Sequence, residues 1–343
     1  MRVAVVGATG AVGREMTRIL AERAFPVDEF VPLASSRSAG SSVTFADRAY
    51  TVGELSEDTL RGADVALVSA GAAVSRAFIP GAAAAGTTCI DNSSAFRMDP
   101  QVPLSIPEVN PHALAGAPRI VAVPNCTTIT VMMAVGPLHR AAGLRSLVLS
   151  SYQSVSGAGQ RGVSELLEQI EKLRGDEDSL AHPDHEALPR GDVMVSTIAY
   201  NVVPKIGAFG ADGYTGEETK MMAEPRKILE LPDLPVIATS VRVPVIVGHG
   251  VSIVAEFSRA VPVAEAREVL ASAPGVELRD DLEAETFPTP IDAAGGDMAL
   301  VGRIRHVPGR DDALVLFSCA DNLRKGAALG AVQIAEHLFG SGT

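Results

Sequence analysis

One cysteine, Cys126, lies where the sequence could make it a nucleophile. It follows a short strand-like run ending in Val123 and Pro124 and precedes an apolar, helix-compatible run, which predicts a helix N-terminus. There the helix dipole and free backbone N–H groups lower the pKa of a thiol and can stabilise an oxyanion on a neighbouring carbonyl. A free cysteine is more usually a small buried residue, and position alone does not decide between the two. We interpret Cys89 and Cys319, inside apolar strand-like runs, as core residues.

A glycine-rich turn near the N-terminus has the spacing G-x-x-G-x-x-G. It follows a strand-like run and opens a helix-like segment. Glycines at this spacing permit a tight turn, let the backbone approach a pyrophosphate and aim a helix N-terminus at that anion. Similar turns also join strands to helices for structural reasons alone, but this context favours dinucleotide binding. The candidate residues are Gly7, Thr9, Gly10, Ala11, Val12 and Gly13.

The end of the next predicted strand indicates which dinucleotide binds. An NAD-binding domain usually has Asp or Glu there, whereas Asp28 and Glu29 lie at the opposite end of this strand. The strand instead ends in Ser35, Ser36 and Arg37, two hydroxyls and a guanidinium that suit a 2′-phosphate. An incidental arginine in a polar loop is the alternative. The sequence therefore predicts NADP.

Several segments, taken together with the cysteine and glycine turns, resemble those of aspartate-semialdehyde dehydrogenases. The resemblance extends from Val3 to the last predicted helix, and the segments follow the order of that family. Several motifs in one order are more specific than any one of them. The segments are DNSSAFRM (91–98), PEVN (107–110), PNCT (124–127), YQ (152–153), SGAG (156–159), RVPV (242–245) and GHG (248–250).

The resemblance implies roles for the residues that match the family's site. Cys126 would be the nucleophile, His249 the acid/base group and Gln153 the residue that positions the reacting carbonyl. The substrate would be held by Arg97 and Lys220 at its phosphate, Arg242 at its carboxylate and Glu217 at its ammonium, with Asn125 beside the nucleophile. Ser156, Gly157 and Asn322 would complete the cofactor site.

The residues by themselves also permit plainer interpretations. Glu217 and Lys220 are three positions apart on a predicted helix, a spacing that often gives a solvated ion pair. A lone histidine is usually structural or exposed. His249, however, lies between Gly248 and Gly250 at the start of a predicted strand, where we expect little side chain to shield it from a cleft.

The implied activity is NADPH-dependent reductive dephosphorylation of L-aspartyl 4-phosphate to L-aspartate 4-semialdehyde through a Cys126 thioester. It would serve the biosynthesis of lysine, threonine, methionine and diaminopimelate, and no step calls for a metal. One alternative is N-acetyl-γ-glutamyl-phosphate reductase, whose uncharged substrate nitrogen gives Glu217 no role and whose nucleophile turn usually carries glycine and tyrosine. Another is a catalytically inactive NADP-sensing protein on the same fold. Glyceraldehyde-3-phosphate dehydrogenase shares a Cys-Thr-Thr turn but lacks the other motifs.

Predicted elements divide the chain in two. Strand-like runs at 2–6, 29–34, 64–69, 87–91 and 119–123 alternate with helical segments, which predicts a parallel sheet with helices on both faces. Longer strand candidates follow at 144–155, 236–243, 251–258, 297–307 and 313–319. The alternating pattern of 251–257 suits an antiparallel sheet with one buried face. Helices are predicted at 160–173, 217–230 and 323–338, and 175–191 is predicted to be an exposed loop.

The predicted fold class is therefore α/β: a Rossmann-like, parallel-sheet NADP-binding domain (1–124), an α+β catalytic and dimerisation domain (125–322), and a C-terminal helix (323–343) that returns to the first domain. The 343 residues are enough for two domains. The resemblance implies a homodimer or homotetramer.

Composition limits the partners and the location. The net charge of −12 argues against a nucleic acid or an anionic membrane as a partner. Three widely spaced cysteines form neither a disulfide framework nor a zinc motif. No apolar run approaches the roughly 20 residues that span a bilayer. These features predict a cytoplasmic protein whose partners are small molecules.

Overall fold

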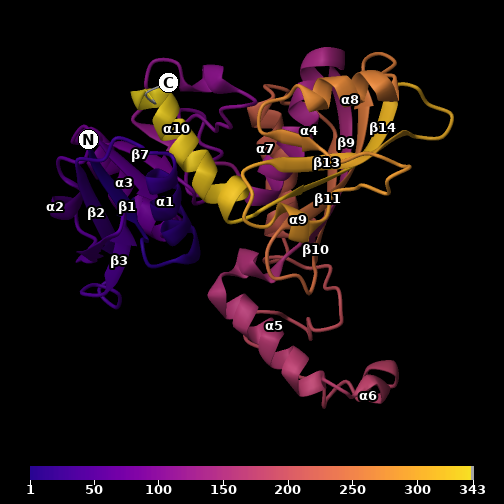
Figure 1. Cartoon of the computed structure of the whole chain (residues 1–343), viewed down its shortest axis with the longest axis horizontal. Helices are drawn as coiled ribbons and strands as arrows, with labels where there is room; N and C mark the ends of the chain where they lie inside the picture. The colour runs from indigo at the N-terminus through magenta and orange to yellow at the C-terminus, as the bar shows by residue number, and fades with distance from the viewer. Residues whose placement is uncertain (341–343) are drawn as a thin grey trace.

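Six parallel strands form the N-terminal sheet in the computed structural model, which describes residues 1–340 (Figure 1). The strand order β5-β2-β1-β6-β7-β8 places β1 near the centre. The turn that follows β1 therefore lies in the middle of the edge formed by the C-terminal ends of the strands. The strands are β1 (Arg2–Val6), β2 (Glu29–Ala34), β5 (Gly53–Glu54), β6 (Val65–Val68), β7 (Thr88–Asp91) and β8 (Ile120–Ala122).

Helices cover both faces of this sheet, as the sequence predicts. Val3 and Val5 of β1 belong to the hydrophobic cluster that includes α1 (Ala11–Glu22) and α10 (Leu329–Phe339). The intervening residues of β1 belong to a second cluster, formed with α2 (Glu57–Leu60) and α3 (Ala72–Ala84). Successive residues of a strand point to opposite faces, so a strand buried on both sides is apolar throughout.

The second sheet is mixed. Its order is β10-β9-β11-β14-β13-β12. The central strand β11 is antiparallel to both of its neighbours, as the alternation predicts, but β10 runs parallel to β9 and β12 runs parallel to β13. The antiparallel pairing expected for 251–257 is therefore confirmed, but the sheet as a whole is not purely antiparallel. The strands are β9 (Leu144–Gln153), β10 (Val236–Arg242), β11 (His249–Phe257), β12 (Val276–Leu278), β13 (Ala299–His306) and β14 (Ala313–Ala320).

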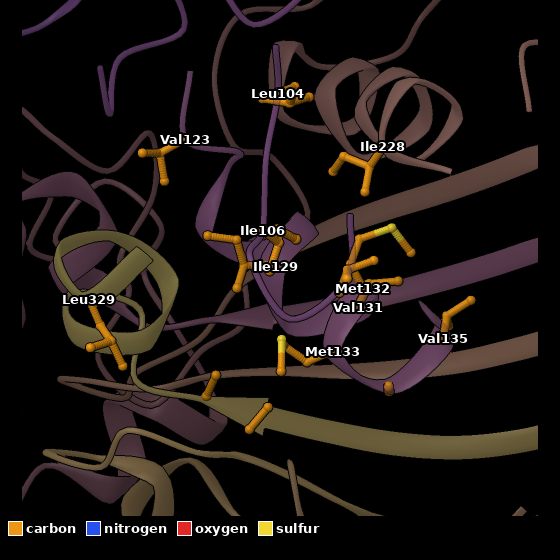
Figure 2. Close-up of a cluster of buried hydrophobic side chains, with 14 of the residues drawn as sticks. Leu104, Ile106, Val123, Ile129, Val131, Met132, Met133, Val135, Ile228 and Leu329 are labelled. Atoms are coloured by element: carbon orange, nitrogen blue, oxygen red, sulfur yellow. The ribbon is translucent and has the colours of Figure 1, made fainter. Parts of the chain in front are cut away.

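Helix α4 (Cys126–Ala142) forms the core beneath this sheet and carries Cys126 at its first position. Almost every residue after Cys126 is buried, because the helix lies between the sheet, α7 (Gly216–Ile228) and the C-terminal segment. Figure 2 shows side chains of α4 packed among residues that are distant in the sequence, including Leu104, Ile228 and Leu329. The helix is therefore fixed on all sides, and its N-terminus is a rigid point.

The C-terminal segment is not the single α-helix predicted for 323–338. A π-helix covers Arg324–Ala328, and α10 follows it. Position 326 requires a glycine, because a Cβ there would lie 2.9 Å from the Cβ of Cys126. Arg324 joins the two halves of the chain: it pairs with Glu15 and Glu22 of α1 and with Asp297 beside the second sheet.

Several elements are absent from the sequence prediction. The predicted loop 175–191 contains helix α6 (Glu177–Ala181), which projects with α5 (Gln160–Leu173) away from the rest of the chain (Figure 1). Further unpredicted elements include the hairpin of β3 (Ser42–Phe45) and β4 (Arg48–Thr51), and the helices α8 (Val263–Ala271) and α9 (Pro290–Ala293). Within residues 1–340, no helix is both long and apolar enough to cross a bilayer.

Candidate active site

Cys126 begins α4, and Asn125 caps that helix. The Asn125 Oδ1 accepts hydrogen bonds from the backbone N–H groups of Thr127 (2.9 Å) and Thr128 (3.3 Å). Asparagine is among the preferred N-cap residues because its side-chain oxygen satisfies these donors. Cys126 is half-buried, whereas Cys89 and Cys319 are buried in strands. The helix start predicted from the sequence is therefore present, and only Cys126 is open to a cleft.

The Cys126 cleft has a volume of about 320 Å³ and is lined by both domains. It brings together most of the predicted nucleophile, phosphate and nicotinamide residues. They are Gly10, Ala11, Val12, Arg97, Asn125, Cys126, Ser156, Gly157 and Asn322. Clefts between domains are common places for ligands, because elements from both sides can converge on them.

The thiol pKa differs from our expectation. We expected the helix N-terminus to favour the thiolate, but burial, reinforced by the Glu217 carboxylate, raises the pKa of Cys126 to about 11. Arg97, the Thr127 hydrogen bond and Lys220 act in the opposite direction and do not overcome it. Without ligand, Cys126 is therefore a thiol at neutral pH, and the expected thiolate is wrong for this state.

Glu217 lies beside the nucleophile turn. Its Oε1 accepts hydrogen bonds from the Asn125 Nδ2 (3.0 Å) and the Gln153 Nε2 (3.2 Å), and its Oε2 pairs with the Lys220 Nζ at 3.1 Å. The Glu217 side chain is only 7% exposed, so a solvated surface pair does not describe it. Burial raises its pKa, but Lys220, Asn125 and Gln153 outweigh burial and hold the Glu217 pKa below its ordinary value.

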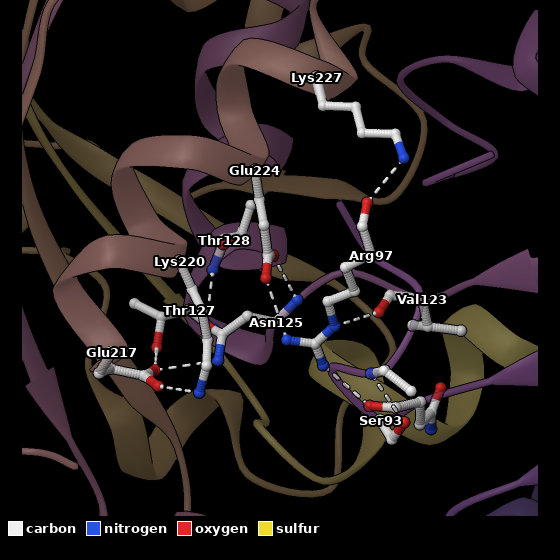
Figure 3. Close-up of polar contacts among 12 residues, drawn as sticks. Ser93, Arg97, Val123, Asn125, Thr127, Thr128, Glu217, Lys220, Glu224 and Lys227 are labelled. Atoms are coloured by element: carbon white, nitrogen blue, oxygen red, sulfur yellow. Dashed lines mark hydrogen bonds and ion pairs between the residues drawn. The ribbon is translucent and has the colours of Figure 1, made fainter. Parts of the chain in front are cut away.

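Arg97 is buried on the other side of Asn125 (Figure 3). Its Nε donates to the carbonyl of Val123 (2.9 Å) and its Nη2 to the carbonyl of Asn92 (2.8 Å). Its Nη1 pairs with the Glu224 carboxylate at 3.0 Å. A guanidinium held by three acceptors has a single orientation, which suits recognition of a planar or tetrahedral anion.

Arg242 ends β10 and is buried close to His249. Its Nη1 donates to the Ser154 carbonyl at 2.7 Å. Burial lowers the pKa of Arg242, while Glu217 and Cys126 oppose that change, so these groups lie within electrostatic reach of one another. A Cβ on Gly157 would lie 3.0 Å from the Arg242 Nη1 and 3.3 Å from the His249 Nε2. Glycine at 157 therefore leaves room beside both side chains.

His249 is fully buried, which corrects our expectation that little would shield it. The Ser154 backbone N–H donates to its Nδ1 at 3.1 Å. A backbone N–H can only donate, so the neutral ring carries its proton on Nε2, an atom with no hydrogen-bond partner among the described residues. Burial, then the nearby Arg242 charge, lower the His249 pKa to about 3, and the ring is neutral at ordinary pH.

A small polar network behind His249 connects it to the C-terminal segment. The Asn322 Oδ1 accepts hydrogen bonds from the Gly248 N–H (2.9 Å) and the Ser154 Oγ (3.0 Å), and its Nδ2 donates to the Ser156 Oγ (3.0 Å). Asn322 thus spans the predicted catalytic and cofactor residues. Ser154 has no predicted role, and nothing in its local sequence indicates one.

A second cleft of about 580 Å³ adjoins the first and shares Gly10 and Ser69 with it. Its lining includes the predicted cofactor residues Gly7, Thr9, Gly10, Ser35, Ser36 and Arg37. Helix α1 begins after Gly10 with no side-chain cap, so its first N–H groups can bind an anion. Gly7 has a φ of +85°, and a Cβ there would lie 2.4 Å from the Ser69 carbonyl oxygen.

Gly13 lines neither cleft but determines how closely α1 approaches the turn. A Cβ on Gly13 would lie 2.1 Å from the Gly7 carbonyl oxygen. The close backbone approach, the uncapped helix and the polar end of β2 together fit a nicotinamide dinucleotide with its adenosine end at Ser35–Arg37 and its nicotinamide end near Cys126.

Glu224 is a site residue that the sequence interpretation missed. It is buried on α7 and contacts Arg97 and the Asn125 backbone. A signal was present, since Glu217, Lys220, Glu224 and Lys227 recur at spacings of three, four and three and must share one helix face.

Known protein families match both halves of the chain. Residues 2–117 match the family described as semialdehyde dehydrogenase, NAD binding domain, and residues 135–325 match semialdehyde dehydrogenase, dimerisation domain. The chain is 49% identical to an aspartate-semialdehyde dehydrogenase of Streptomyces akiyoshiensis, over 98% of each protein. It is 45% identical to one of Aquifex aeolicus, over 99% of this chain and 98% of the relative.

Solved structures agree with these matches. The aspartate semialdehyde dehydrogenase II of Vibrio cholerae, complexed with ASA, superposes with a TM-score of 0.90 at 39% identity and covers 100% of this chain and 99% of its own. A structure from Pseudomonas aeruginosa, described as a probable aspartate-semialdehyde dehydrogenase, gives a TM-score of 0.89 at 32% identity, over 99% and 98% of the two chains.

Proposed function

The chain belongs to the aspartate-semialdehyde dehydrogenase family, and from that premise we propose that it converts L-aspartyl 4-phosphate and NADPH to L-aspartate 4-semialdehyde, NADP and phosphate through a thioester on Cys126. The observation that carries the proposal is the convergence of Cys126 with a buried carboxylate and separate cationic groups. Glu217 is on one side of Asn125 and Arg97 is on the other. Such a set complements a substrate that has an ammonium, a carboxylate and a phosphate.

The chain's own residues supply most of the reaction. The Cys126 sulfur attacks the acyl carbon and the C–O bond to phosphate breaks. The thiol proton leaves with the phosphate, so the products of this step are the thioester and hydrogen phosphate. Arg97 and Lys220 stabilise the charge on that phosphate, and Arg242 holds the α-carboxylate. The positive end of the α4 dipole stabilises the oxyanion, while Gln153 orients the carbonyl. The bound dinucleotide supplies the hydride that reduces the thioester.

His249 supplies a proton at Nε2. The Ser154 N–H holds the ring in the tautomer that has a proton there, so His249 begins as a donor. The proton compensates the negative charge that develops on the carbonyl oxygen, and it returns to Nε2 as the C=O bond of the aldehyde forms. The C–S bond breaks in that step, and the Cys126 thiolate that leaves takes up a proton from solvent.

Glu217 decides between the two acyl phosphates considered above. Its carboxylate is ionised and already has its hydrogen-bond donors in place, so it favours a charged ammonium. The acetylated nitrogen of N-acetyl-γ-glutamyl phosphate carries no charge to pair with it. A protein that only senses NADP would need neither this carboxylate nor an accessible cysteine.

The cofactor is a nicotinamide nucleotide, and within that class we propose NADP. Ser35, Ser36 and Arg37 are exposed at the edge of the second cleft, where a 2′-phosphate could bind them. The polar groups at this position would be of little use to the uncharged ribose of NAD.

The dimerisation-domain match makes the protein an oligomer, and we propose a homodimer with the domain boundaries 1–124, 125–322 and 323–343. The outer face of the second sheet supports the proposal, since Val148, Tyr152 and Ile237 are partly exposed there. We also propose the cytoplasm as its location, because three unpaired cysteines suit a reducing compartment.

A spectrophotometric assay of NADPH formation tests the function. Wild-type protein with aspartate semialdehyde, NADP and phosphate should turn over, and N-acetylglutamate semialdehyde should be a poor substrate. Cys126→Ala should abolish turnover while NADP still binds, whereas Cys89→Ala should stay active.

Arg37→Leu should weaken NADP binding about tenfold or more and leave NAD binding nearly unchanged. Turnover by Cys126→Ala, or equal losses for both dinucleotides, would contradict the assignments.

A further inference from the structure

Helix α7 carries two further charged residues on the face that bears the residues assigned to the substrate. Glu217 and Lys220 contact each other at the site, and Glu224 and Lys227 continue the same stripe one and two turns later. The Lys227 ammonium donates to three backbone carbonyls, those of Arg97 (2.7 Å), Asp99 (2.6 Å) and Val102 (2.8 Å). The loop that bears Arg97 is therefore tied to α7 through its backbone.

Glu224 makes the more specific connection. Its side chain is 1% exposed, and each of its oxygens meets a different part of the site. The Oε2 accepts from the backbone N–H of Asn125 at 2.7 Å, and the Oε1 accepts from the Arg97 Nη1 at 3.0 Å (Figure 3). A buried carboxylate destabilises the fold unless it is paired and hydrogen-bonded, so removing either partner would lower the stability of the protein.

The hydrogen bonds of Arg97 leave two of its N–H groups available for a ligand. A guanidinium has five N–H donors, and within the described residues three of them are engaged, by Val123, Asn92 and Glu224. One N–H remains on each terminal nitrogen. Because Arg97 also lines the Cys126 cleft, these two donors form a fork for an anion there.

We propose that Glu224 is a positioning residue that fixes this fork relative to the nucleophile, so that one buried carboxylate holds both the phosphate-binding arginine and the entry to α4. The inference rests on the proposed function, in which Arg97 binds the leaving phosphate. Rotation of the guanidinium about its own axis would break the contact with Glu224. Movement of the nucleophile turn would break the bond to Asn125.

Glu224→Gln tests this with little change in shape. A carboxamide offers one acceptor oxygen where two donors require one each, so either Arg97 or the Asn125 N–H loses its partner. In the oxidative direction, the KM for inorganic phosphate should rise about tenfold or more, while the KM for NADP changes little. Glu224→Asp keeps the charge but is too short to reach both donors, and should raise the phosphate KM in the same direction.

A second measurement does not depend on turnover. Iodoacetamide should alkylate Cys126, and inorganic phosphate bound at Arg97 should slow that reaction. The phosphate concentration that halves the alkylation rate should be about tenfold higher in Glu224→Gln than in wild type. A carboxylate that only stabilises the fold would leave this concentration unchanged in folded protein.

Glu218→Gln is the matched control. Glu218 is also buried on α7, and each of its two oxygens also accepts one hydrogen bond, here from the backbone N–H groups of Thr215 (2.7 Å) and Ser240 (2.9 Å). It should leave both phosphate readouts near wild type. Equal shifts in Glu218→Gln and Glu224→Gln, or none in the Glu224 variants, would overturn the positioning role. If wild-type protein shows no phosphate-dependent NADPH formation at all, the proposed function fails instead.

Discussion

At the scale of single residues, the state of Cys126 depends on opposing neighbours. Burial and Glu217 raise the thiol pKa, and Arg97, Thr127 and Lys220 lower it. A substrate ammonium paired with Glu217 would neutralise the carboxylate charge that, together with burial, raises the thiol pKa. Cys126 of the ligand-free enzyme should therefore react slowly with oxidants and alkylating agents near neutral pH, because the thiolate is the reactive form.

The rate at which iodoacetamide alkylates Cys126 should follow from this balance. In ligand-free protein the rate should keep increasing as the pH rises from 7 toward about 11, with no plateau near neutrality, because the pKa of Cys126 is about 11. At pH 8, Glu217→Gln should react about threefold faster or more, and Lys220→Met correspondingly slower. Mass spectrometry of the Cys126 peptide measures the rate, and a plateau below pH 9 would contradict the assigned environment.

His249 should contribute to acid sensitivity. Its pKa is about 3 in the folded protein, against an ordinary value of 6.5, so its contribution to stability is fully present above pH 6.5 and falls as the pH drops toward 3. Between pH 7 and 4.5, the free energy of urea unfolding should fall less in His249→Gln than in wild type, by about 2–3 kcal/mol. His185→Gln, at an exposed position, is the control and should follow wild type.

At the scale of elements, the turn between β1 and α1 depends on the absence of side chains. Gly13→Ala would place a Cβ 2.1 Å from the Gly7 carbonyl oxygen, and both groups belong to the backbone, so α1 must move away from the turn. We expect a loss of more than about 2 kcal/mol of stability and at least tenfold weaker NADP binding. Thermal melts and cofactor titrations measure the two effects.

The control for this substitution is Gly81→Ala in α3. The nearest atom to a Cβ on Gly81 is the Glu57 Oε1, at 3.8 Å, so there is room for a methyl group. Alanine is the better helix former, and this change should stabilise the protein by about 0.5–1 kcal/mol. If Gly13→Ala is as well tolerated as Gly81→Ala, close backbone packing does not explain the glycine.

At the scale of the whole molecule, two features join the parts of the chain. The Arg324 guanidinium contacts carboxylates of α1 and Asp297, and α10 packs against the first domain after the π-helix has passed Cys126. The C-terminal segment therefore links the nucleophile, Asn322 and the nucleotide-binding domain. A shift of one domain against the other would alter the cleft at the same time.

The outer face of the second sheet should hold two copies together. Ile237 of β10 lies directly beside Val148 of β9. The residues of β9 on either side of Val148 are buried on the opposite face, toward α4. Ile237→Lys should shift the protein toward monomers in sedimentation velocity experiments, because it places a charge in an apolar interface. Leu282→Lys, at a more exposed apolar residue off the sheet, should leave the assembly unchanged. The reverse result would place the interface elsewhere.

The sequence alone was sufficient for features that depend on local geometry. Glycine spacing after an apolar strand predicted the turn of Gly7–Gly13, and the placement of Cys126 between a strand and an apolar run predicted a helix start. Strand and helix alternation predicted the parallel sheet, because periodicity follows from which faces are buried. The resemblance to the family added the substrate class, since motifs in a fixed order carry more information than any single turn.

Only the tertiary structure decided what depends on distant parts of the chain. Burial made His249 neutral and Cys126 a thiol, although local reasoning predicted an unshielded histidine and a thiolate. Desolvation depends on everything that packs around a group, which no local window contains. For the same reason, the partners of Glu224 could not be read from its own segment, although the helix spacing puts it on the same face as Glu217. Arg97 and Asn125 are 127 and 99 residues away and meet Glu224 only because α7 lies beside α4.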